Sequence, residues 1–536
     1  MKHLFLTSML LLSTVAAFAQ NSAVVAQNGT ANSASALQGG SSLTATISQV
    51  GTTPTTVTNN TAITNQTGTG HSATINQNGT APNGSTFNRA YATQRNGTTG
   101  ANSVTISQSN GSGGAAARGG DRSVVAGDLG NFAGTFQEGN GNKAAVIQDG
   151  PNSKANIGEI TQKGDNNTAT TTQNGTQSGV ALIYQGFDPN VPVVNIAVTS
   201  NTATIDQSGS TANQAYIRQF SDGNTAFVRQ IGANSTTNLA RIDQGPGGSG
   251  NTATVRQGIG SSTITSNTAL IGQYGTNGFA TIDHDLNGRA TSNLASITQT
   301  TGSLSNTATI TQSSGSNARF NVASIQQAGS NGFANIYEDI GSRFNQSSIQ
   351  QGVGSSGDKA YIRQYGSFTA TTSISQNLTA TPGGSSNNVA SVVMGTSTED
   401  AASMTAVVSQ EGKNNSALLS QAGIVAGHKA TITQTGNNNV VTGPLSAASI
   451  GSGQIAPGNY AQQGGAGQVV TVNQTSLGGA SIYGNSLSLS QLGISNTGTV
   501  NQTIGAGAMS NNVGMLTQNG TGNFGTVTQF NGTIVP

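Results

Sequence analysis

One short cluster in the chain has the residue types that acid–base or metal chemistry requires. Asp283, His284 and Asp285 follow one another. Adjacent side chains of an extended strand point to opposite faces, so two carboxylates that flank one histidine point away from it. The other histidines of the processed chain, His71 and His428, are distant in sequence. We therefore interpret all three as polar substitutes in a repeated structural position, and we predict no metal site, no cofactor and no enzyme.

The composition removes several further functions. The chain has no Cys, which excludes thiolate zinc sites, disulfide frameworks and cysteine nucleophiles. Charged residues make up 7% of the 536 residues and the net charge is +1, so no basic surface follows a phosphate backbone and we predict no nucleic-acid partner. A polysaccharide-cleaving enzyme needs convergent acids, whereas the 18 acidic residues are scattered. An enzyme is therefore the third-ranked hypothesis.

Amides and small aliphatic residues recur at fixed spacing instead. Asn201, Ala203, Ile205 and Gln207 define the frame Asn-x-Ala-x-(Ile/Val)-x-Gln. Its period of two places these four side chains on one face of a strand. The linking pattern Gln-x-Gly-x-x-Asn indicates tight turns, because Gly and Asn tolerate positive φ. The frame returns with its amides at Asn213 and Gln219, Asn224 and Gln230, Asn238 and Gln244, Asn251 and Gln257, Asn267 and Gln273, Asn293 and Gln299, Asn306 and Gln312, and Asn321 and Gln327.

Amides on the inward face require partners. A buried amide that lacks a hydrogen-bond partner costs about 1–3 kcal/mol. The cost disappears if identical amides stack every ~4.7–4.8 Å and bond to the copies above and below. A lone coil cannot offset its own ordering entropy. The sequence therefore predicts an all-β fold, a β-solenoid of stacked two-strand coils of about 22–29 residues each.

The frame and its turns resemble the curlin repeat, found in the subunits of bacterial curli fibres. The resemblance covers most of residues 21–530. It implies a protein secreted to the surface of a Gram-negative bacterium and assembled into amyloid-type fibres that support biofilm and cell adhesion. It also implies self-association, a nucleating subunit and an outer-membrane export pore as partners. The frame positions are then the assembly residues: Asn and Gln for the ladder, Ala for close sheet approach, and Ile or Val for the dry centre.

Several segments depart from the repeat. Residues 1–19 combine Lys2 with an apolar run and end in Ala17-Phe18-Ala19, which predicts a signal peptide cleaved before Gln20. Residues 20–536 form the predicted solenoid, and we expect no membrane span in this mature chain. Gly-rich or Pro-containing stretches predict loop insertions. These insertions are expected near 111–130, 186–200, 377–405 and 440–466.

The main alternative function is a monomeric β-solenoid adhesin or stalk that binds through its loops. A weaker alternative is an ice-binding or polysaccharide-binding solenoid, because outward positions often hold Thr, as at Thr202 and Thr204. Residues such as Tyr216 and Arg218 interrupt that array. The threonines are therefore better interpreted as strand-forming residues on a solvated face.

Overall fold

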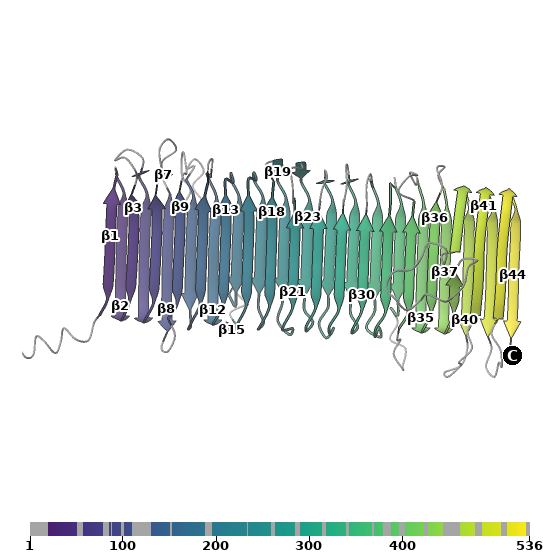
Figure 1. Ribbon diagram of the computed structural model, residues 1–536. Coiled ribbons are helices and arrows are strands. Elements are labelled where there is room, and N and C mark those ends of the chain that lie inside the picture. The colour runs from purple at the N-terminus through teal and green to yellow at the C-terminus, as the bar shows by residue number, and fades with distance from the viewer. Residues whose placement is uncertain are drawn as a thin grey trace, which may run out of the picture. The chain divides into compact units, whose positions relative to one another are not determined.

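The computed structural model divides the chain into two compact units, Met1–Gly250 and Asn251–Pro536, and each is described by itself. Every element described is a β-strand, which confirms the predicted all-β fold (Figure 1). The structure describes residues 20–29, 31–50, 57–78, 85–86, 88–97, 101–109, 130–150, 153–187, 196–232, 234–258, 263–284, 290–312, 318–338, 342–366, 369–378, 387–395, 403–422, 427–442, 461–476, 485–504 and 512–531.

In the first unit, successive strands alternate between two parallel sheets. The first sheet contains β1 (Ser22–Asn28), β3 (Thr44–Val50), β6 (Ser72–Asn78), β9 (Ser103–Ser109), β11 (Lys143–Asp149), β13 (Thr168–Asn174), β16 (Thr202–Ser208) and β18 (Thr225–Ile231). The second sheet contains β2 (Ser33–Ser41), β5 (Thr61–Thr69), β8 (Arg89–Gly97), β10 (Phe132–Glu138), β12 (Ile157–Asp165), β14 (Val180–Gln185), β17 (Gln214–Gln219) and β20 (Leu239–Gln244). The short strands are β4 (Val57–Thr58), β7 (Ser85–Thr86), β15 (Val198–Thr199) and β19 (Asn234–Thr236).

The second unit has the same alternation. Its first sheet contains β21 (Thr252–Gln257), β24 (Phe279–His284), β27 (Thr307–Gln312), β30 (Phe333–Glu338), β32 (Lys359–Gln364), β34 (Val389–Met394), β36 (Ser416–Ala422), β38 (Val440–Thr442), β39 (Ala461–Ala466), β41 (Asn485–Ile494) and β43 (Asn512–Thr521). Its second sheet contains β23 (Thr268–Gln273), β26 (Leu294–Gln299), β29 (Val322–Gln327), β31 (Gln346–Gln351), β33 (Thr371–Gln376), β35 (Thr405–Lys413), β37 (Lys429–Asn437), β40 (Val469–Ser476), β42 (Thr497–Ile504) and β44 (Phe524–Asn531). The short strands are β22 (Thr263–Thr265), β25 (Ala290–Thr291) and β28 (Ala318–Arg319).

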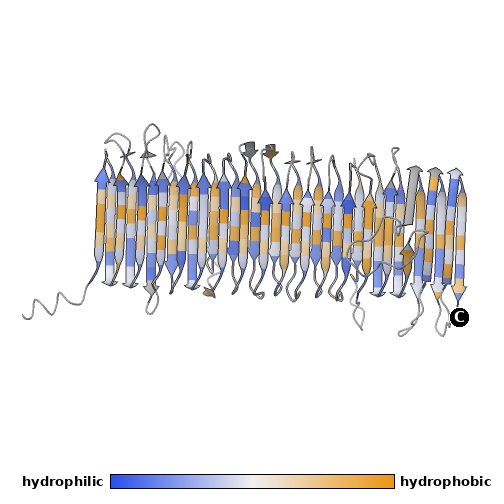
Figure 2. Cartoon of the chain, in the orientation of Figure 1, coloured by the Kyte–Doolittle hydropathy of each residue, from blue (hydrophilic) through white to orange (hydrophobic). Residues whose placement is uncertain are grey.

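Each coil therefore contributes one strand to each sheet, except that β38 and β39 together occupy one position between β36 and β41. The predicted β-solenoid is confirmed. The register stacks identical frame positions: Ala203 pairs with Ala226, and Gln207 with Gln230. A slip of one residue would turn every apolar side chain outward, so burial of one face locks this register. Along β16 the inward residues are buried and the others are partly or fully exposed. Figure 2 shows the resulting apolar bands across neighbouring strands.

The turns use more residue types than the sequence indicated. We expected Gly and Asn at positive φ, yet the residue before the frame asparagine is often another type, such as Ser200 at φ 57° and Ser266 at φ 56°. Phe320 and Phe344 both have φ 56° at this position. Their side chains are exposed and stack on each other with ring centroids 5.1 Å apart. The coil geometry thus requires a left-handed backbone conformation at this position, and tertiary contacts stabilise it even where the residue type disfavours it.

Several predicted features lie outside the described residues. These are the signal peptide at 1–19 and, within the predicted insertions, residues 111–129, 188–195, 379–386, 396–402 and 443–460. Strand pairing is continuous on either side of the first of these insertions, since β8 pairs with β10 and β9 with β11. Among the described residues, no helix has the length and apolar character to cross a membrane.

Candidate functional site: the amide ladders

Buried glutamine side chains at the frame position form continuous ladders in the first unit. In the first sheet, Gln207 Nε2 donates to Gln230 Oε1 at 2.7 Å, and in the second sheet Gln219 donates to Gln244 at 2.8 Å. The second Nε2 hydrogen reaches backbone carbonyls across the coil, as from Gln207 to the Asn213 oxygen at 3.2 Å. Each buried amide thus has the partners that its desolvation requires.

These glutamine ladders have a direction. Among the described residues, each bond between two frame glutamines runs from Nε2 of one coil to Oε1 of the coil that follows in sequence, beginning with Gln27 to Gln49 at 2.6 Å. In the second unit, the second sheet keeps this order from Gln273 to Gln299 at 2.9 Å and from Gln299 to Gln327 at 3.0 Å. The same ladder continues through Gln351, Gln376, Gln410, Gln434, Gln474, Gln502 and Gln529.

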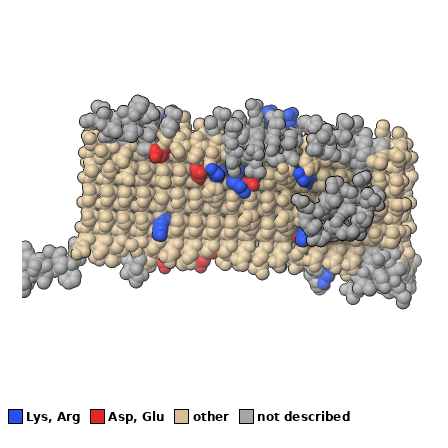
Figure 3. Space-filling model, in the orientation of Figure 1, with Lys and Arg blue, Asp and Glu red and all other residues tan. Residues whose placement is uncertain are grey.

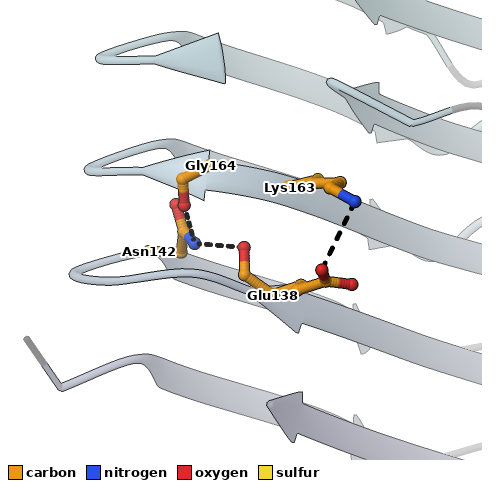
Figure 4. A network of polar contacts seen from close by, with 4 residues as sticks. All are labelled: Glu138, Asn142, Lys163 and Gly164. Carbon is orange, nitrogen blue, oxygen red and sulfur yellow. Dashed lines mark hydrogen bonds and ion pairs between the residues drawn. The ribbon is translucent and has the colours of Figure 1, made fainter. Parts of the chain in front are cut away.

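The frame asparagines form a different ladder. Asn201 Oδ1 accepts the backbone N–H of Asn224 at 2.8 Å, and Asn213 Oδ1 accepts that of Asn238 at 2.9 Å. The amide nitrogen reaches a turn: Asn142 Nδ2 donates to the Gly164 oxygen at 2.7 Å (Figure 4). The asparagine side chain is one methylene shorter than glutamine, so it bonds mainly to backbone, whereas we expected each amide to bond to its copy.

The remaining predicted asparagines follow the same arrangement. In each case the side-chain Oδ1 accepts a backbone N–H of the next coil. Asn251 accepts from Gly278, Asn267 from Asn293, Asn293 from Asn321, Asn306 from Gly332, and Asn321 from Asn345. Between the two amide ladders, Ala203 is 1% exposed and Ile205 is fully buried. The aliphatic residues therefore form a dry centre flanked by two rows of hydrogen-bonded amides.

The glutamine ladder in the first sheet of the second unit is interrupted at alternate coils. His284, Glu338 and Met394 occupy the glutamine position of β24, β30 and β34. The predicted ladder residues Gln257 and Gln312 therefore do not bond to glutamine copies. Gln257 Nε2 lies 3.2 Å from His284 Nδ1, and Gln312 Nε2 donates to Glu338 Oε2 at 2.8 Å.

Burial controls the protonation of both ionisable substitutes. Desolvation lowers the pKa of the fully buried His284 to about 4, and an interaction with the Gln312 side chain opposes this change. Desolvation raises the pKa of the fully buried Glu338 to about 7, and hydrogen bonds from Gln312 and Ser347 oppose the rise. Each group therefore favours its neutral form inside the coil.

The other two histidines occupy the asparagine position, as predicted. His71 Nδ1 accepts the backbone N–H of Asn102 at 3.2 Å, and His428 Nδ1 accepts that of Gln468 at 3.4 Å. Burial lowers the pKa of His71, opposed by its hydrogen bond with the Thr67 oxygen. The two Nδ1 bonds match those that asparagine Oδ1 makes in other coils, so a neutral imidazole replaces the amide oxygen as acceptor.

Of the two acidic residues beside His284, the structure describes Asp283, which pairs with an arginine. Asp283 forms an ion pair with Arg256 at 2.8 Å, and burial raises the pKa of Asp283 while Arg256 opposes the rise. Asp285 lies outside the described residues. Across the described ranges, no three His, Asp or Glu side chains gather where they could hold a metal ion. The face shown in Figure 3 carries few charged side chains.

Sequence reasoning missed several substitutions at the ladder positions, and three of them concern Glu338, Met394 and Asp358. Glu338 and Met394 replace the frame glutamine, and Asp358 replaces the frame asparagine. Asp358 is fully buried; it accepts hydrogen bonds from Ser355 Oγ at 2.6 Å, Asn377 Nδ2 at 2.7 Å and the Asn388 N–H at 2.8 Å. Alignment of every repeat to the frame would have found them, since their Ala and Ile or Val neighbours are in place.

Comparison with known proteins agrees with the repeat. The model of the curlin associated repeat matches residues 20–51 and 199–232. The search of curated proteins gave no match. The curlin-repeat family is structural and non-enzymatic and is associated with extracellular curli, so the repeat and the β-solenoid together indicate a curli-like structural or adhesive protein. The resemblance predicted from the sequence is confirmed at these two places, where the chain matches the curlin associated repeat.

Proposed function

We propose that the chain is a secreted structural subunit of amyloid-type surface fibres that support a biofilm matrix and cell adhesion. Growth occurs by strand addition at the end coils. The observation that carries this proposal is the common direction of the glutamine ladders, because it makes the two ends of the ladders chemically complementary.

The N-terminal end coil presents acceptors. The ladders begin at Gln27 and Gln38, whose Nε2 atoms donate to the next coil at 2.6 and 2.9 Å. No described side chain donates to their Oε1 atoms. β1 is exposed along its whole length, and Val25, an inward frame residue, is 47% exposed. A further coil stacked on β1 would bury this valine and supply the missing amide donors.

The C-terminal end coil presents donors. Gln518 and Gln529 accept from the preceding coil at 2.6 Å each. Each also donates one Nε2 hydrogen across the coil, to the Thr497 and Val513 oxygens. The second amide hydrogen faces the end of the ladder. N-terminal acceptors therefore match C-terminal donors, which favours head-to-tail addition of like subunits over pairing of two identical ends.

A matched pair of variants tests this proposal. Val25→Lys places a charge on the inward face of β1, whereas Val24→Lys places it on the outward face of the same strand, where Val24 is 54% exposed. We expect fibre growth, followed by dye binding, electron microscopy and the ~4.7 Å diffraction spacing, to be abolished by the first change and retained by the second. Equal growth of both variants would refute end-coil addition. A wild-type protein that stays a soluble monomer for days would instead support the adhesin or stalk alternative.

A further inference from the structure

The interrupted ladder of the second unit leaves a buried acceptor without a donor. Gln364 on β32 occupies the register position next to Glu338 on β30. In the unbroken second sheet, the corresponding bond runs from Gln351 Nε2 to Gln376 Oε1 at 2.9 Å. A carboxylate has no hydrogen to donate, and Gln364 Oε1 is buried with no hydrogen-bond partner.

The two oxygens of Glu338 already accept hydrogen bonds from other groups. Gln312 Nε2 donates to Oε2 and Ser347 Oγ donates to Oε1, both at 2.8 Å. An ionised Glu338 would present only lone pairs toward the neighbouring carbonyl oxygen, and both side chains are fully buried. One proton on the carboxyl group converts this repulsion into an O–H···O bond of the kind that the ladder requires.

We propose that Glu338 enters the ladder as a neutral carboxylic acid that donates its proton to Gln364 Oε1, so that the ladder between β30 and β32 closes when the proton is bound and opens when it is lost to solvent. The proton thus replaces the amide hydrogen that glutamine supplies in other coils. His284, two coils before Glu338 in the same ladder, lies on the opposite side of Gln312 and does not contact Gln364.

The strands around Glu338 supply no compensating charge on the inward face. β27, β29 and β31 contain no titratable side chain. The charged residues of β32, Lys359 and Arg363, occupy outward register positions, as does Tyr337 on β30. Burial raises the pKa of Glu338 to about 7, and the hydrogen bonds from Gln312 and Ser347 oppose the rise. The other inward ionisable groups of these coils are His284 and Asp358, and Asp339 lies outside the described residues.

Infrared difference spectroscopy of the full chain tests the proposal. At about pH 5.5, the spectrum of wild type minus that of Glu338→Gln should contain the carbonyl band of one protonated, hydrogen-bonded carboxylic acid, and this band should titrate away with a midpoint near pH 7. Glu411→Gln, at a partly exposed acid of the same unit, is the control and should leave the band in place. Absence of the band in the wild type would overturn the proposal.

A second variant separates the ladder bond from burial. Gln364→Leu removes the acceptor while Glu338 stays buried. If Glu338 donates its proton to Gln364, the variant removes the hydrogen-bond acceptor of protonated Glu338 and the repulsive neighbour of ionised Glu338. Both changes favour ionisation, so the midpoint of the Glu338 band should fall by about one pH unit or more. A midpoint that is unchanged or higher would show that desolvation alone retains the proton and would refute the role in the ladder. Glu338→Gln restores the common frame residue and is expected to fold.

Discussion

Replacing Glu338 with glutamine is expected to stabilise the coil around β30 at alkaline pH. The pKa of Glu338 rises from 4.5 to about 7 on folding. Burial of Glu338 therefore does not destabilise the folded coil below about pH 4.5. It destabilises the coil increasingly above that pH, and the loss of folding free energy is complete above pH 7. Since one pKa unit corresponds to about 1.36 kcal/mol, that complete loss is about 3 kcal/mol. Glu338→Gln should recover this free energy at pH 8 and change nothing at pH 4.

His284 has the opposite dependence. Its pKa falls from 6.5 to about 4 on folding, so the cost of burying it is absent well above pH 6.5 and reaches about 3 kcal/mol below pH 4. As the pH rises between these limits, the destabilisation due to Glu338 grows while that due to His284 falls by a similar amount. The stability of this segment in the wild type should therefore depend little on pH. Glu338→Gln should expose the acid sensitivity due to His284, and His284→Gln should expose the alkaline sensitivity due to Glu338.

Hydrogen exchange of peptides from β27, β30 and β32 measures this effect locally. At pH 8, Glu338→Gln should slow exchange in these peptides roughly 100-fold relative to the wild type, which corresponds to about 3 kcal/mol. Exchange in β42, distant in sequence, should not change. The double variant with His284→Gln should be protected at both pH extremes. Exchange at pH 8 that is unchanged or faster in Glu338→Gln would refute the assignment of a buried, destabilising carboxylate.

Two further predictions concern the ladder and the turns. Gln351→Leu removes the donor to Gln376 and the acceptor for Gln327, so it should lower the free energy of unfolding in urea by about 2–5 kcal/mol; Gln350→Leu, exposed on the same strand, should change it by less than about 0.5 kcal/mol, and equal effects would contradict a structural ladder. Gly412 has φ 115° and a Cβ there would overlap the Gly436 oxygen, so Gly412→Ala should cost more than about 2 kcal/mol. Gly302→Ala, with no atom within 4 Å of its Cβ, should cost about 1 kcal/mol, and an equal thermal shift for both would contradict a close backbone approach.

The sequence by itself determined the strand, its inward face and its repetition. The alternation of Asn201, Ala203, Ile205 and Gln207 has a period of two, and a buried amide at either end is stable only when copies of the coil stack in register. These local rules were sufficient to predict a two-strand β-solenoid, and the same repeated frame carries the resemblance to the curlin repeat. They assigned the histidines to the ladder as well, because a frame position defines its environment whichever residue occupies it.

Only the tertiary structure decided which atoms bond. The lengths of the side chains direct Gln207 to the glutamine of the next coil and Asn201 to the backbone of the next asparagine. The turns placed Phe320 and Phe344 at positive φ against local preference. The structure also aligned His284, Glu338 and Met394 in one ladder, since residues 54 and 56 apart in the chain come within two coils of each other only when coils stack. Protonation in that ladder depends on burial, which is a property of the assembled stack.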